Sequence, residues 1–162
     1  MIKNLIEFHE IIFISPDIFT LIRIVFFITV SLYSMITDVK KKEVNGIVLL
    51  VLTIVFCISW LFIDLRAFIY SLSGAAGIAC IFLFISFVSQ GGIGLGDMLY
   101  LTFYSSLFGV IFTLFSFLFS FWIATLVLII PYKMNKLDKN TRIPFVPFLF
   151  TGSVMSLLLI FI

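Results

Sequence analysis

The sequence predicts an all-α, polytopic membrane protein with about six transmembrane helices in one bundle. Hydrophobic residues make up 63% of the 162 residues, charged residues only 11%, and the mean hydropathy is +1.32. A hydrocarbon core is crossed by about 20 helical residues, and several apolar runs approach or exceed that length. They cover residues 18–37, 47–63, 67–89, 98–131 and 145–162. Such a composition belongs in a bilayer.

The fourth apolar run, residues 98–131, is too long for one span. Small residues near positions 105–109 favour a tight reversal there, which divides the run and makes the fourth helix short. In the third run, Ser73 and Gly77 form a pair of small residues four apart, a spacing that permits close approach of two helices in lipid. We therefore expect a packed bundle of six spans.

Residues 1–17 are the least hydrophobic part of the chain. Apolar residues recur there at roughly helical spacing with charged residues between them, which favours an amphipathic helix at the membrane interface. A cleavable signal peptide is disfavoured because Glu7, His9 and Glu10 interrupt the apolar stretch. The chain divides into this amphipathic segment and a single membrane-embedded domain over residues 18–162.

Basic residues indicate how the bundle is oriented. Seven of the ten fall in two stretches beside spans, namely Lys40, Lys41 and Lys42 after the first, and Lys133, Lys136, Lys139 and Arg142 before the last. Six spans place both stretches on one side, which the positive-inside rule makes cytoplasmic. Both termini are then outside, and residues 90–96 emerge on the cytoplasmic face. Basic residues clustered beside spans do not indicate nucleic-acid binding.

Two carboxylates share this cytoplasmic face. Asp38 closes the first apolar run, and Asp97 opens the fourth after the glycines Gly94 and Gly96. An ionisable group at membrane depth is costly, so it is a candidate functional residue. The alternative for each is a helix-end carboxylate without function, since Asp97 would be stabilised by the dipole at a helix N-terminus.

Polar residues at helical spacing favour the functional interpretation. Ser31, Ser34 and Asp38 lie at positions i, i+3 and i+7, and so form one stripe at the inner end of the first helix. Asp97, Tyr100 and Tyr104 repeat the same spacing from the start of the fourth helix. We expect both stripes to face the protein interior.

The glycines before Asp97 leave the backbone free to approach another chain closely or to adopt positive φ. The set comprises Gly91, Gly92, Gly94 and Gly96. An extended substrate backbone is one segment that such a stretch would accommodate.

Two neighbouring carboxylates can share one proton, and this is the machinery of an aspartic protease. The ionised carboxylate takes a proton from the attacking water, and the protonated one donates to the peptide carbonyl oxygen. The helix dipoles weakly favour charge on Asp97, at a helix N-terminus, over Asp38, near a helix C-terminus, although Lys40, Lys41 and Lys42 oppose this.

No metal or cofactor is expected. Cys57 and Cys80 lie within apolar runs without CxxC spacing and are interpreted as small apolar residues. His9 has no Cys, Asp or second His at ligand spacing.

Three blocks of the sequence resemble the type IV prepilin peptidases, which are aspartic proteases with a GxGD motif. The blocks are DVKKKEV at residues 38–44, GLGD at 94–97 and IPFVPFL at 143–149. The resemblance implies that Asp38 and Asp97 are the catalytic pair. The glycines Gly94 and Gly96 would support the motif, and Pro144 and Pro147 would either contact the substrate or simply open the last helix.

The resemblance also implies a substrate and a location. The partner would be a prepilin-like or preflagellin-like protein with a basic leader and a hydrophobic helix, cut at the cytoplasmic face of the cell membrane among membrane lipids. The chain resembles the short, peptidase-only form, so methylation of the new N-terminus is not expected. The served system, whether pilus, secretion pseudopilus, competence apparatus or archaellum, and the oligomeric state are left open.

Two positions depart from the family pattern. Leu99 stands where relatives commonly have lysine, and Asn45-Gly46 where they often have Pro-Asn. An inactive homologue is therefore one alternative. A second is a small transporter or noncatalytic assembly factor that binds a cation or proton at the aspartates, which would have polar residues and broken helices within its spans. The signal-peptide-peptidase or presenilin-like group is disfavoured because Tyr-Asp and Pro-Ala-Leu blocks do not occur.

Overall fold

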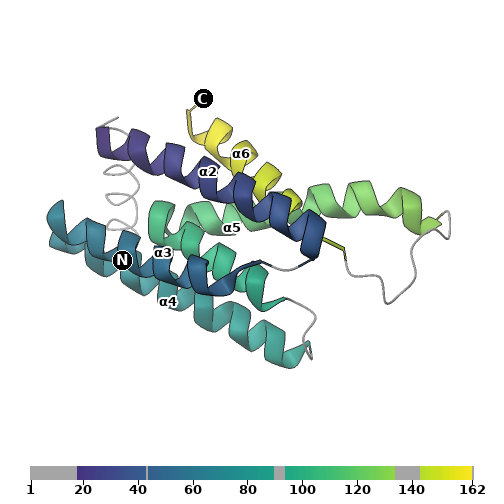
Figure 1. The fold of residues 1–162 in the computed structure, drawn as a ribbon, viewed down its shortest axis with the longest axis horizontal. Helices are drawn as coiled ribbons and strands as arrows, with labels where there is room; N and C mark the ends of the chain where they lie inside the picture. Colours follow the sequence, from purple (N-terminus) through teal and green to yellow (C-terminus); the bar gives the residue numbers. More distant parts are fainter. Residues whose placement is uncertain (1–17, 43, 90–93, 134–142, 162) are drawn as a thin grey trace.

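The computed structural model describes residues 18–42, 44–89, 94–133 and 143–161, and all the regular structure in these ranges is helical (Figure 1). Three helices are long and apolar enough to cross a membrane, over Phe19–Lys41, Leu65–Val88 and Leu95–Ile129, and two shorter apolar helices cover Gly46–Phe62 and Val146–Leu159. The protein is therefore an integral, polytopic membrane protein. The elements in order are α2 (Ile18–Lys41), α3 (Gly46–Ser59) with the 3₁₀ turn η1 (Trp60–Phe62), α4 (Leu65–Val88), α5 (Leu95–Lys133) and α6 (Val146–Phe161). The amphipathic helix expected over residues 1–17, together with Gly91 and Gly92, lies outside the described residues.

Local signals set the helix ends. The Asn45 side chain accepts a hydrogen bond from the Val48 amide (3.3 Å) at the start of α3, and Asp64 accepts one from the Arg66 amide (3.0 Å) at the start of α4. The first helix continues through Lys41, four residues past the end of the predicted span at residue 37. It stops where Lys42 adopts a left-handed φ of 54°, and the Lys42 amide donates a hydrogen bond to the Asp38 carbonyl (2.8 Å). Asp38 thus lies inside the last turn of α2.

Helix α5 is interrupted at Gly109, which has φ 83° and ψ 173°. The ribbon changes direction there (Figure 1), within the stretch 105–109 where the sequence predicts a division. Glycine reaches this positive φ without the steric cost of a side chain. Trp60 Nε1 (3.0 Å) and Ser71 Oγ (2.8 Å) both donate to the carbonyl of Ser106, one of the carbonyls that a helix ending at this point leaves without an intrahelical partner.

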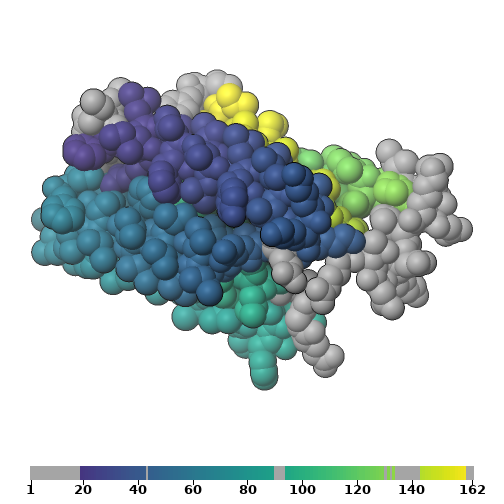
Figure 2. Space-filling view, viewed as in Figure 1, coloured from purple at the N-terminus to yellow at the C-terminus, as the bar shows by residue number. Residues whose placement is uncertain are grey.

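Aromatic side chains fill the centre of the bundle. Phe27 of α2 meets Tyr104, Phe108 and Phe112 of α5, with ring-centroid distances of 4.7, 5.1 and 6.4 Å. Most of the large aliphatic side chains on the outer faces are exposed, as lipid-facing residues should be. Figure 2 shows one such face, where α2 and α3 lie beside each other.

The predicted contact at Ser73 and Gly77 is wrong. Both residues are exposed, and a Cβ built on Gly77 would meet nothing within 4 Å. The close approach is made at Gly74, where a Cβ would lie 2.9 Å from Val110 Cγ2 and 3.1 Å from Ser105 Oγ. Spacing alone identified a small-residue pair but not which face of α4 packs on α5, since small residues occur all around this stretch of the helix.

Candidate active site

Asp38 lies where α2 meets the beginning of α6. Its side chain is only 6% exposed, and its Oδ2 accepts a hydrogen bond from the Val146 amide at an N to O distance of 3.0 Å. The Phe145 amide also lies near this carboxylate. Asp38 therefore joins the first sequence block to the third.

The start of α6 explains why these amides are available. The first N–H groups of a helix have no intrahelical acceptor, and Val146 is the first residue of α6. Pro147 follows and has no N–H to satisfy. Both Pro144 and Pro147 are half-buried around this helix start. Asp38 therefore caps α6, and the partial positive charge of the helix N-terminus faces its carboxylate.

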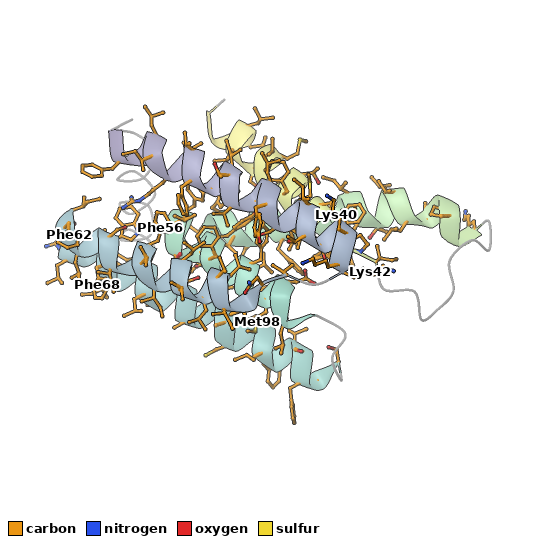
Figure 3. The ribbon with its side chains drawn as sticks, viewed as in Figure 1. Lys40, Lys42, Phe56, Phe62, Phe68 and Met98 are labelled. Carbon is orange, nitrogen blue, oxygen red and sulfur yellow. The ribbon has the colours of Figure 1, made fainter. Side chains whose placement is uncertain are left out.

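Asp97 lies in the first turn of α5, with its side chain half-buried. Its carboxylate interacts electrostatically with that of Asp38. The end of α2 and the starts of α5 and α6 lie at one end of the bundle (Figure 1). In Figure 3, Lys40 and Lys42 mark this end of α2, while Phe62 and Phe68 lie at the opposite end. The structure thus brings together the two aspartates that the sequence singled out.

Both predicted polar stripes face the interior. Ser31, Ser34 and Asp38 are buried along α2, and Tyr100 and Tyr104 are fully buried along α5. Asp97, at the end of its stripe, keeps partial access to solvent. This confirms the interpretation of the spacing, because lipid-facing positions would be exposed.

The glycines of the second block allow close contact within the chain. A Cβ on Gly96 would lie 3.1 Å from Val44 Cβ, so the connection between α2 and α3 presses directly on α5. A Cβ on Gly94 would lie 3.3 Å from Asp97 Oδ2. Neither glycine has positive φ, which among the described glycines occurs at Gly109 alone. Glycine at positions 94 and 96 therefore allows close packing because it lacks a side chain, and not because the backbone there has unusual φ angles.

Residues 25–130 match the type IV leader peptidase family, about two thirds of the chain. The chain belongs to this family. Its members are aspartic peptidases that remove prepilin leaders, so the protein is an enzyme of that class. The match includes Asp38 and Asp97, whereas the IPFVPFL block lies beyond it. Searches of curated proteins and of solved structures returned no match.

Family membership selects the peptidase over the transporter. The structure does contain the two features that a transporter would show, a broken helix at Gly109 and buried polar residues within spans. In this leader peptidase the broken helix is α5, and its first turn carries Asp97 of the GLGD block.

The two departures from the family pattern contact each other in this peptidase. Leu99 Cδ1 lies 2.8 Å from where a Cβ on Gly46 would be, so the leucine fills the space next to this glycine. Asn45 provides the cap that begins α3. Each departure therefore has a local structural role at the junction of α3 and α5, and neither removes a carboxylate.

The contribution of Val146 was missed by sequence reasoning. Its functional group is a backbone amide, which no residue pattern marks, although Pro147 was a signal that a helix begins nearby. From the sequence, the two aspartates differ in the dipoles of their own helices and in the lysines that follow Asp38. The structure adds the N-terminus of α6 to the surroundings of Asp38.

Replacing Gly96 with alanine should disturb this site more than replacing Gly46. The new Cβ at 96 would meet Val44 Cβ, which moves only with the backbone, whereas at 46 it meets the flexible end of Leu99. We expect Gly96→Ala to lower the free energy of unfolding by about 1 kcal/mol and to slow leader cleavage, with Gly46→Ala near wild type. Thermal unfolding in detergent and cleavage rates measure both, and a Gly46→Ala enzyme slower than Gly96→Ala would contradict the packing argument.

Proposed function

We propose that the enzyme hydrolyses the peptide bond after the basic leader of prepilin-like proteins, with Asp38 and Asp97 as the catalytic pair. The observation that carries this proposal is that all three sequence blocks meet at one end of the bundle, where Asp38 accepts a hydrogen bond from the first residue of α6 and Val44 packs against Gly96 of the Asp97 block.

The reaction needs one carboxylate as base and one carboxylic acid. The base takes a proton from water as the water oxygen attacks the peptide carbonyl carbon, and the acid donates its proton to the carbonyl oxygen. Collapse of the tetrahedral intermediate breaks the C–N bond: the carboxyl group that took the proton from water gives it to the leaving amine, and a hydroxyl of the intermediate returns a proton to the other carboxylate. The partial exposure of Asp97 supports access of water and substrate from that side.

The proposed topology has six spans, with α5 divided at Gly109. The short apolar helices α3 and α6 then cross the membrane together with α2, α4 and the two parts of α5. The exposed lysines at the end of α2, Lys40, Lys41 and Lys42, support a cytoplasmic orientation of the proposed catalytic end of the bundle. A prepilin with its hydrophobic helix in the bilayer presents the leader junction at this same level.

Co-expression with a candidate prepilin from the same genome tests the proposal. We expect the prepilin to lose its leader, as a shift on a gel and as a new N-terminus by mass spectrometry, and to keep it when the peptidase is absent. A neighbouring gene that encodes a short basic leader before an apolar helix provides the substrate to test first. An enzyme present in the membrane that leaves every such prepilin intact would support the inactive homologue, and continued cleavage by a chain lacking both aspartates would exclude the two-aspartate mechanism.

A further inference from the structure

A hydrogen-bonded cluster lies beneath the aspartates. The Tyr104 hydroxyl donates to the Tyr100 hydroxyl at 2.6 Å and lies 3.5 Å from Ser31 Oγ and 3.4 Å from Ser153 Oγ. Ser31 also lies near the Tyr100 hydroxyl. All four residues are fully buried, and they come from α2, α5 and α6. Tyr104 is the member that touches all three others, so we call this set the Tyr104 cluster.

The Tyr104 cluster repeats the arrangement of the active site two helical turns deeper. Ser31 precedes Asp38 by seven residues on α2, and Tyr104 follows Asp97 by seven on α5. Ser153 follows Val146, the residue that donates to Asp38, by seven on α6. Seven residues are close to two turns, so each pair shares one helix face and is separated by roughly 10 Å along the axis. The same three helices therefore meet at two levels.

Aromatic rings close off the far side of the cluster. Phe27 packs on the Tyr104 ring at 4.7 Å, and Phe112 lies 6.4 Å from that ring. Both phenylalanines are buried, and their rings carry no nitrogen or oxygen atom. The hydroxyls of Ser31, Tyr100 and Tyr104 have partners within the cluster, and Ser153 Oγ in addition donates to the Phe150 carbonyl of its own helix (2.7 Å). Because an unsatisfied buried hydroxyl is costly, the contacts of the tyrosine hydroxyls must be kept. This requirement constrains how far each helix can slide or rotate relative to the other two.

We propose that Tyr104 is a positioning residue for leader cleavage, and that its contacts with Ser31 and Ser153 hold α2, α5 and α6 in the register that sets Asp38 opposite Asp97. The inference rests on the proposed function. Tyr104 acts through the helices and not on the substrate, because its hydroxyl is fully buried two turns from the carboxylates. Removing that hydroxyl should therefore alter the geometry of the pair and leave the contacts with substrate in place.

The test compares Tyr104→Phe with Tyr33→Phe. Tyr33 lies on the exposed face of the same helix as Ser31, so its hydroxyl is the matched control. We expect Tyr104→Phe to lower kcat for a purified prepilin at least tenfold with KM within twofold of wild type, measured per folded enzyme well below the unfolding temperature. Tyr33→Phe should match wild type. A role in stability alone would reduce the amount of folded enzyme and leave kcat unchanged.

A double-mutant cycle with Ser153→Ala checks that the effect passes through the cluster. The losses in kcat from Tyr104→Phe and Ser153→Ala, expressed as activation free energies, should add up to more than the loss in the double variant. The reason is that both substitutions remove the same contact. An unchanged kcat in Tyr104→Phe, or strictly additive losses, would overturn the positioning role. Asp97→Asn in the same assay separates the two proposals, since an active Asp97→Asn enzyme contradicts the catalytic pair whatever Tyr104→Phe does.

Discussion

Asp38→Asn and Asp97→Asn should each reduce kcat for leader removal by about 100- to 10,000-fold. An amide neither takes a proton from water nor donates one as a carboxylic acid does, so either substitution leaves the pair without one of its two functions. The measurement is cleavage of a prepilin by equal amounts of membrane-inserted enzyme. Cleavage by either variant at the wild-type rate would contradict the assignment.

Asp64→Asn is the matched control for this prediction. Asp64 also caps a helix, α4, through a hydrogen bond to the Arg66 amide. Asparagine caps a helix about as well as aspartate, so this variant should retain full activity. A large loss in Asp64→Asn would show that the assay responds to any aspartate replacement.

A second substitution at position 38 separates chemistry from structure. The side-chain oxygen of an asparagine can still accept the hydrogen bond from the Val146 amide, so Asp38→Asn should unfold close to wild type. Alanine cannot accept it, and a buried amide left without a partner costs about 1–3 kcal/mol. Asp38→Ala should therefore be both inactive and less stable in thermal unfolding. Equal stability of the two variants would show that Asp38 does not hold α6.

Gly152→Ala should be strongly destabilising, because Gly152 leaves less room for a Cβ than Gly46, Gly74, Gly77, Gly94 or Gly96. A Cβ at this position on α6 would meet Ser120 Oγ, and would lie 2.5 Å from the Ser116 carbonyl oxygen and 2.6 Å from the Ser120 amide nitrogen. Two of these three atoms are backbone, so α6 must move away from α5. Overpacking of this kind costs about 1–3 kcal/mol.

The displacement of α6 should alter the active site as well as lower the stability. The first residue of α6 donates to Asp38 and Ser153 contacts Tyr104, so a shifted α6 disturbs both levels. We expect lower thermal stability together with a severe loss of leader cleavage.

Gly77→Ala provides the comparison for Gly152→Ala. Gly77 lies within α4, where a Cβ meets nothing within 4 Å. Alanine is favoured over glycine in a helix interior by about 0.5–1 kcal/mol, so this variant should be at least as stable as wild type and fully active. If Gly152→Ala behaved like Gly77→Ala, α5 and α6 would not pack as closely as the structure has them.

Much of the architecture follows from the apolar runs in the sequence and from the residues that interrupt them. The helices α2, α3, α4 and α6 lie within a few residues of the predicted runs, and the break at Gly109 falls where small residues predicted a division. Periodicity identified the buried stripes ending at Asp38 and beginning at Asp97, because one polar face on an apolar helix has no other favourable place than the interior. The face of α4 that packs was not predicted, since Ser73 and Gly77 satisfied the same spacing rule as the residues that are buried.

The sequence by itself determined that the chain enters a membrane and, to within a few residues, where the described helices lie, and it predicted which two aspartates form the catalytic pair, because composition, caps and residue spacing are local properties. Only the tertiary structure decided what meets what: the Val146 amide at Asp38, Leu99 at Gly46, and Tyr104 between Ser31 and Ser153. These contacts join residues as many as 108 positions apart. Which faces pack together depends on the shapes of all the helices at once, and a backbone amide or a missing Cβ leaves no mark in a pattern of side chains.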